Sequence, residues 1–113
     1  MAIELVDFPD WSPVTLPDSQ RDPWFETLCL PTGARTTLHF CMPHQVVTEP
    51  GRLNVNYTMF EATSIPARWA AASRGHDLVI VPTDSSRRAW LAGGVPDRLL
   101  RLCPLGIDAA LFG

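Results

Sequence analysis

The sequence predicts an α/β fold, a layered sandwich built on a mainly parallel sheet. Its 113 residues are 46% hydrophobic, which suits one domain with a single modest core. From residue 53 onward, short apolar runs alternate with single helical stretches. Strands and helices in the order β-α-β-α-β imply parallel strands joined by right-handed crossovers. We therefore place the folded domain in residues 34–113.

Residues 1–33 differ from the rest because they combine frequent prolines with large aromatic rings. Prolines remove amide donors and interrupt helices, so this segment is expected to be irregular. Large rings rarely remain in water, and we predict an arm that packs on a protein surface. The rings belong to Phe8, Trp11, Trp24 and Phe25.

The domain begins with two predicted strands and a helix. Residues 36–42 are rich in β-branched and aromatic side chains, and residues 53–60 alternate with a period of two. A helix is predicted over residues 65–75, with Ser64 as a candidate N-cap and Gly75 at its C-terminal end. Pro66 fits the first turn of this alanine-rich helix.

The second half of the domain repeats the strand–helix alternation. Residues 78–82 form a continuous apolar run, typical of a strand buried on both faces. Thr83 or Asp84 is predicted to cap a helix over 85–92, which ends at Gly93-Gly94. Residues 98–104 are the last apolar run and the last predicted strand.

Composition argues against several classes of function. A formal charge of −3 and the lack of lysine leave no basic patch for nucleic acid. No stretch approaches the ~20 apolar residues that cross a bilayer, and the acidic N-terminus is unlike a secretory signal. We therefore expect a cytoplasmic protein without a transmembrane segment. Its three cysteines, Cys29, Cys41 and Cys103, lack disulfide or zinc spacing and are expected to be reduced and mostly buried.

Polar residues follow the predicted strands at their carboxyl ends, where open parallel sheets bind ligands. A carboxylate, hydroxyls at a helix N-terminus and a histidine can together bind a sugar or a phosphate. An ordinary N-cap at Thr83 or Asp84 and a solvated acid at Glu61 are the alternative interpretations. The residues in question are His44, Glu61, Thr83, Asp84, Ser85, Gly106 and Asp108.

No motif for a metal or a cofactor stands out. His39, Cys41 and His44 are close in sequence, but their spacing matches no tetrahedral site and a fourth ligand is not evident. The sequence has no phosphate-binding or dinucleotide-binding glycine motif, and Gly93-Gly94 is better explained as a helix end. We expect neither a cofactor nor a metal.

Four motifs in order resemble those of the group-1, family-four, retaining glycosyltransferases, and residues 1–33 take no part in the resemblance. The motifs are Asn54-Val55-Asn56-Tyr57-Thr58-Met59-Phe60-Glu61 with Ile65-Pro66 and Trp69, Asp77-Leu78-Val79-Ile80-Val81-Pro82-Thr83, Gly93-Gly94-Val95-Pro96, and Cys103-Pro104-Leu105-Gly106-Ile107-Asp108.

The resemblance implies a GT-B enzyme with two Rossmann-like, three-layer domains, of which residues 34–113 are part of the N-terminal, acceptor-side half. It makes Glu61 the candidate catalytic residue. Tyr57, Thr83, Gly106 and Asp108 match motif positions and join His44, Asp84 and Ser85 as candidate substrate-binding residues, although Tyr57 is alternatively a strand aromatic that packs on Trp69. The family's donor-binding glutamate pair has no counterpart, so the expected partners are a sugar acceptor and, only through a second domain, a nucleotide-sugar donor.

Two other functions stay open. A non-catalytic binding or self-associating module would use an exposed sheet edge and the aromatic arm, and a small hydrolase would use Glu61 with His44. In the glycosyltransferase interpretation the chain has no activity alone. A sheet truncated at its first strand leaves an apolar face and an edge uncovered, so we expect the arm or a partner to cover them.

Overall fold

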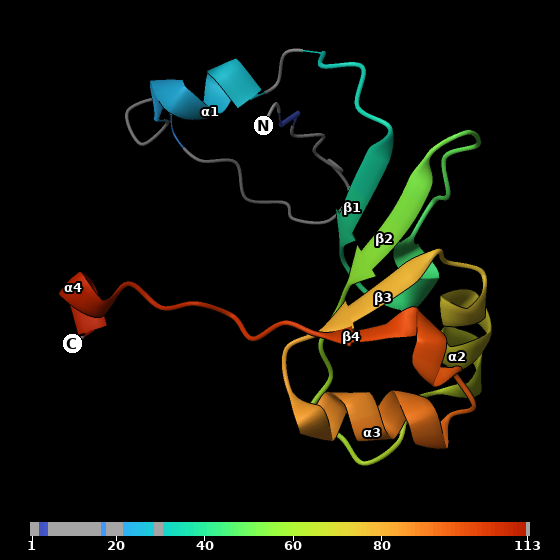
Figure 1. Ribbon diagram of the computed structural model, residues 1–113. Helices are drawn as coiled ribbons and strands as arrows, with labels where there is room; N and C mark the ends of the chain where they lie inside the picture. The colour runs from blue at the N-terminus through green and yellow to red at the C-terminus, as the bar shows by residue number, and fades with distance from the viewer. Residues whose placement is uncertain (1–2, 5–16, 18–21, 29–30, 113) are drawn as a thin grey trace. The chain divides into compact units, whose positions relative to one another are not determined.

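The structure is a computed structural model that describes residues 3–4, 17, 22–28 and 31–112 (Figure 1). The chain divides into two compact units, Met1–Ala34 and Arg35–Gly113. The first unit contains a short helix, α1 (Pro23–Leu28). Most of the predicted arm, including Phe8 and Trp11, lies outside the described residues, so its packing stays a prediction.

The second unit is built on four parallel strands. They are β1 (Thr36–Phe40), β2 (Leu53–Tyr57), β3 (Leu78–Val81) and β4 (Leu100–Leu102), and they lie side by side in chain order. This confirms the predicted α/β fold with a parallel sheet. Each strand is shorter than its predicted run, and the last begins late because Asp97–Leu99 forms a 3₁₀ turn, η3.

The connections between the strands contain the predicted helices. The turn η2 (Pro43–Gln45) follows β1, α2 (Ala67–Arg74) follows β2, and α3 (Asp84–Ala92) follows β3. The proposed cap at Ser64 is wrong, because Pro66 occupies the N-cap position of α2 with an extended ψ of 142°. The chain turns into the helix only after this proline. A last helical turn, α4 (Ala109–Phe112), lies near the C-terminus.

The helix α3 ends in a Schellman motif at Gly93-Gly94, where the sequence predicted its end. The Gly94 amide donates to the Leu91 carbonyl at 3.0 Å, and the Val95 amide donates to the Trp90 carbonyl at 3.1 Å. Gly94 has φ +84°, a conformation that side chains with a Cβ disfavour. Val95 and Trp90 are both buried, which supplies the hydrophobic contact that accompanies this motif.

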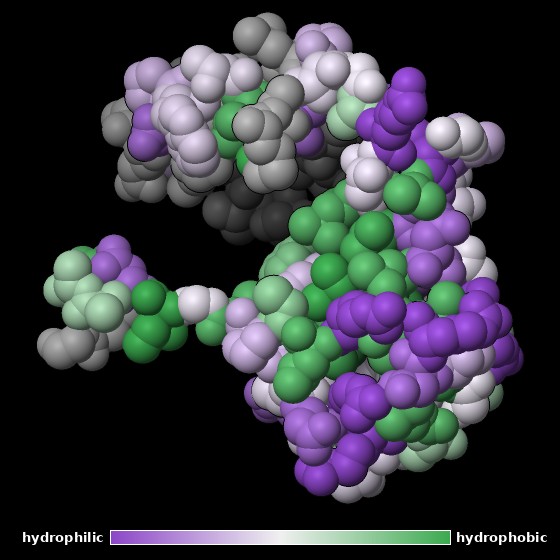
Figure 2. Space-filling model, in the orientation of Figure 1, coloured by the Kyte–Doolittle hydropathy of each residue, from purple (hydrophilic) through white to green (hydrophobic). Residues whose placement is uncertain are grey.

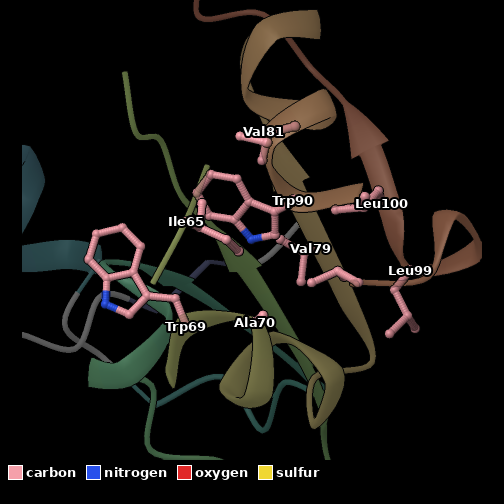
Figure 3. Packing of buried hydrophobic residues seen from close by; sticks show 10 residues of the cluster. Ile65, Trp69, Ala70, Val79, Val81, Trp90, Leu99 and Leu100 are labelled. Atoms are coloured by element: carbon pink, nitrogen blue, oxygen red, sulfur yellow. The ribbon is translucent and has the colours of Figure 1, made fainter. Parts of the chain in front are cut away.

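Both helices pack on the same face of the sheet, which we call the covered face. Trp69 of α2 and Trp90 of α3 belong to one core with Val79 and Val81 of β3 (Figure 3). The predicted three-layer sandwich is therefore not formed by the described residues of 35–112. The reason is topological, because strands added in one direction with right-handed crossovers place every connection on the same side.

The other face of the sheet, which we call the open face, is hydrophobic. Leu38 and Phe40 of β1 and Leu53 of β2 are 58%, 64% and 57% exposed. Val55 shares this face by its register opposite Leu38. Figure 2 shows hydrophobic residues gathered over the strands.

Candidate functional site

The carboxyl ends of the parallel strands bring three segments of the chain together at one edge. The Thr58 hydroxyl after β2 lies 4.0 Å from the Met42 sulfur after β1. The Ser86 hydroxyl, in the first turn of α3, donates to the Phe60 carbonyl at 3.4 Å. The loop that carries Glu61 is thus fixed beside the N-terminus of α3, as expected for neighbouring strands of a parallel sheet.

Thr83 is the N-cap of α3. An ordinary N-cap at this position was one of the two interpretations that the sequence left open. Its Oγ1 accepts a hydrogen bond from the Ser86 amide at 3.1 Å and lies 3.0 Å from the Ser86 hydroxyl. Asp84 forms an exposed ion pair with Arg88 at 3.1 Å, one helical turn away. Ser85 is exposed. At this helix end, Thr83 is engaged in the cap and Ser85 presents an exposed side chain.

An aromatic cluster lies next to this edge. The Trp69 ring stacks on His44, with 5.6 Å between ring centroids and 11° between planes, and meets Phe60 edge-on at 4.7 Å. His44 is exposed while Trp69 is buried. Trp69 therefore contacts both His44 and Phe60, the residue before Glu61. It links these two predicted site positions, His44 and Glu61.

Tyr57 does not pack on Trp69, so that expectation is wrong. Its ring stacks on Phe40 at 5.3 Å, and its hydroxyl donates to the Cys103 carbonyl at 2.6 Å. The register pairs Tyr57 with Ile80, whereas the neighbouring pair, Asn56 with Val79, lies on the covered face. Alternation along β2 thus puts Tyr57 on the opposite side of the sheet from α2. Its contacts are structural.

Asn56 positions the segment that carries His44, a role the sequence reasoning missed. Its side-chain amide is fully buried and donates to the carbonyls of His39 and Cys41 at 3.0 and 2.9 Å. The Gln45 side chain then accepts from the Met42 amide at 2.9 Å. The signal lay in the alternating asparagines of β2, which place two amides on one face of the strand.

Glu61 is exposed at the carboxyl edge, and the two remaining candidates lie in the segment that follows β4. Gly106 and Asp108 are both exposed. The Asp108 carboxylate accepts from the Ala110 amide at 2.9 Å and so begins α4. Within the described part of the chain, no hydrogen bond or ion pair joins either residue to Glu61.

The expectation that the cysteines are mostly buried holds only in part. Cys41 is half-buried and burial raises the pKa of its thiol, but Cys103 is exposed because it lies just past the end of β4. Cys29 lies outside the described residues. Among the residues that the structure describes, no three histidine, cysteine or acidic side chains gather as a metal site.

Comparisons with known proteins found no relative of this chain. No protein-family model matches the chain, and searches of curated proteins and of solved structures found no significant match. Over the described ranges, no helix is long and apolar enough to cross a membrane.

Proposed function

We propose that this chain is the acceptor-side part of a GT-B glycosyltransferase, which transfers a sugar from a nucleotide-sugar when a donor-binding domain completes it. The observation that carries the proposal is that two segments with motif residues lie next to each other at the carboxyl edge of the sheet. Glu61 follows β2 and Thr83–Ser85 follow β3, and the Ser86–Phe60 hydrogen bond holds the two segments together. The resemblance of the four motifs supplies the reaction class.

The exposed groups at this edge suit a hydroxyl-rich acceptor. The Glu61 carboxylate can accept a hydrogen bond from the acceptor hydroxyl and take up its proton as that oxygen bonds to the anomeric carbon of the donor sugar. The bond from that carbon to the nucleotide diphosphate breaks in the same transfer, and the nucleotide leaves on the donor-binding domain. Ser85 offers a hydroxyl, and the N-terminus of α3 offers a partial positive charge. The exposed ring of His44, held flat on Trp69, adds a polar group to the same rim.

A binding and turnover comparison tests this proposal. Simple glycosides and nucleotide-sugars are each mixed with the chain and followed by saturation-transfer NMR, and product formation is measured in parallel. We expect some glycosides to bind, nucleotide-sugars not to bind, and no transfer by the chain alone. Glu61→Gln should weaken glycoside binding, whereas Thr63→Ala, a change of an exposed residue in the same loop, should not. Hydrolysis of a glycoside by the unmodified chain would instead support the hydrolase built on Glu61 and His44.

A second candidate function is a non-catalytic binding module derived from the same fold. The observation that favours it is the exposed hydrophobic side chains of Leu38, Phe40 and Leu53 on the open face. Contiguous apolar surface of this kind marks interaction sites in folded proteins. This function predicts partner binding through the sheet and no response to glycosides at Glu61.

A further inference from the structure

The two tryptophans of the core differ in how their indole nitrogens are satisfied. Trp90 Nε1–H donates to the Ser73 hydroxyl at 3.1 Å. Trp69 is only 7% exposed, yet its Nε1–H finds no acceptor within the described part of the chain. Figure 3 shows this nitrogen on the side of the Trp69 ring that is turned away from Trp90. Buried indole N–H groups normally have a hydrogen-bond partner, so the exception at Trp69 indicates an acceptor that comes from another molecule.

The Trp69 ring is partly covered by the exposed side chain of His44. Their planes are 11° apart and their centroids 5.6 Å apart. Rings in contact lie about 3.5 Å apart, so the centroids are offset sideways by about 4 Å and the imidazole overlaps only the margin of the indole. No hydrogen bond joins the His44 ring to any described residue. Ring stacking shifts an equilibrium by only about 2- to 12-fold, so the His44 ring can leave Trp69 at little cost.

The backbone that carries His44 is, by contrast, held firmly. Met42 and Gln45 close the turn η2 with two reciprocal hydrogen bonds of 2.9 Å, and the buried Pro43 fixes φ at its start. Asn56 anchors the residues just before this turn. Movement of His44 is therefore confined to its side chain. Exposed side chains change rotamer rapidly, so the indole can be uncovered without disturbing the sheet.

Trp69 also adjoins the segment that carries the candidate catalytic carboxylate. Phe60 meets the Trp69 ring edge-on, with 4.7 Å between centroids, and Glu61 follows Phe60 in the chain. A ring that replaces His44 on Trp69 would thus lie next to the Glu61 segment. A pyranose suits this place, because it combines an apolar C–H face with oxygen atoms that accept hydrogen bonds.

We propose that Trp69 is a stacking subsite for a pyranose ring, which displaces the His44 side chain. The C–H face of the sugar packs on the indole, and a hydroxyl that overhangs the ring edge accepts a hydrogen bond from Nε1–H. His44 acts as a cover that shields the indole from water until the sugar binds. This inference rests on the proposed function, because it names the ring that the acceptor presents at the carboxyl edge.

The experiment follows the tryptophans of the full chain by fluorine NMR after labelling with fluorotryptophan. The probe is methyl β-D-glucopyranoside, whose ring hydroxyls are all equatorial and leave both faces apolar. D-Sorbitol, which carries hydroxyls without a rigid ring, is the matched control. Single tryptophan-to-phenylalanine variants assign the resonances. We expect the glucoside to shift the Trp69 resonance and to leave that of Trp90 in place, and sorbitol to shift neither.

Two variants at His44 test the cover. His44→Ala removes the ring and should keep the affinity for the glucoside or raise it by up to ~3-fold. His44→Phe should lower the affinity at least ~5-fold, because displacement would push an apolar ring into water. If His44 itself were the platform, phenylalanine would rescue binding and alanine would lose it. Arg74→Ala, a change at an exposed position in the last turn of α2, should leave binding unchanged.

The outcomes separate this subsite from the proposed function. Glucoside binding that leaves the Trp69 resonance in place, tighter binding by His44→Phe than by His44→Ala, or no glucoside binding would each overturn the subsite. Binding of other glycosides that Glu61→Gln weakens would still uphold the proposed function in those cases. A Trp69 shift that survives Glu61→Gln with unaltered affinity would instead support the subsite and count against the proposed function.

Discussion

The indole Nε1–H of Trp90 donates a hydrogen bond of 3.1 Å to the Ser73 hydroxyl, joining α3 to α2 beneath the sheet. Trp90 and Ser73 are both fully buried. The bond satisfies the indole nitrogen of Trp90, the largest fully buried side chain. It also fixes the spacing of the two helices that cover the sheet.

Removing this hydroxyl should destabilise the fold. Ser73→Ala leaves the buried indole donor without its acceptor, so we expect the free energy of unfolding to fall by about 1–3 kcal/mol. Ser85→Ala, a matched change at an exposed position of α3, should have almost no effect. Chemical denaturation of the two variants measures the difference, and equal stabilities would show that the bond contributes nothing.

The left-handed conformation of Gly94 predicts a cost for alanine there. Gly94→Ala should lower the free energy of unfolding by about 1 kcal/mol, because a Cβ strains the backbone at φ +84°. Gly106→Ala is the control, since its Cβ would meet nothing within 4 Å and its φ lies outside the left-handed region. Thermal unfolding should separate the two, and a Gly94→Ala variant as stable as the control contradicts the assigned helix end.

His76 should make stability depend on pH. Burial lowers the pKa of its imidazole from the ordinary value of 6.5; His39 adds to the lowering and Asp77 opposes it. The folded state therefore binds this proton less readily than the unfolded chain does. Its contribution to stability is fully present above pH 6.5 and is lost as the pH falls toward the lowered pKa.

The test compares unfolding of the unmodified chain and His76→Gln between about pH 7.5 and about pH 5. The unmodified chain should lose stability on acidification more steeply than the variant. His44→Gln removes an exposed histidine and should keep the steep dependence. Identical slopes for all three proteins would rule out His76 as the source.

The N-cap role of Thr83 predicts a loss of stability when its hydroxyl is removed. Thr83→Ala should cost about 1 kcal/mol of stability through loss of the N-cap hydrogen bond to Ser86. Thr83→Ser keeps a hydroxyl and should retain most of that stability. Denaturation midpoints measure both variants, and an alanine variant as stable as the serine variant would mean that the cap is unimportant.

The sequence pattern predicted the element order well because its signals are local. Proline and glycine mark the ends of α2 and α3, and the apolar run at residues 78–82 identified β3. Thr83 was among the two predicted caps, and the structure gives it that place. Periodicity and caps depend only on neighbouring residues, so these features needed no knowledge of tertiary contacts.

The faces of the sheet could not be predicted in the same way. Alternation was correct in residues 53–57 of the predicted run 53–60, but alternation alone does not say which set of side chains meets the helices. Asn54 and Asn56 lie on the covered face and Leu53 on the open face, the reverse of a simple apolar core. The same limit misplaced Tyr57 against Trp69. The third layer was expected from the family resemblance, and the strand order β1-β2-β3-β4 explains its absence from the described residues.

The sequence predicted that the candidate site lies at the carboxyl edge of the sheet, but not which of the candidate residues meet there. The parallel sheet brings the Glu61 loop to the N-terminus of α3, as the strand ends imply. Gly106 and Asp108 follow a three-residue strand in an exposed segment, and nothing local in the sequence fixes their distance from Glu61. The role of Asn56 emerged only from its two long-range hydrogen bonds.

The most direct test of the proposed function is an amide-resolved NMR titration of the chain with the glycosides that bind it. The account predicts shifts at Phe60–Glu61 and at Thr83–Ser85, weakened by Glu61→Gln, and none with nucleotide-sugars. Glycoside-induced shifts that avoid both segments, or glycoside binding unaltered by Glu61→Gln, would contradict an acceptor site at this edge.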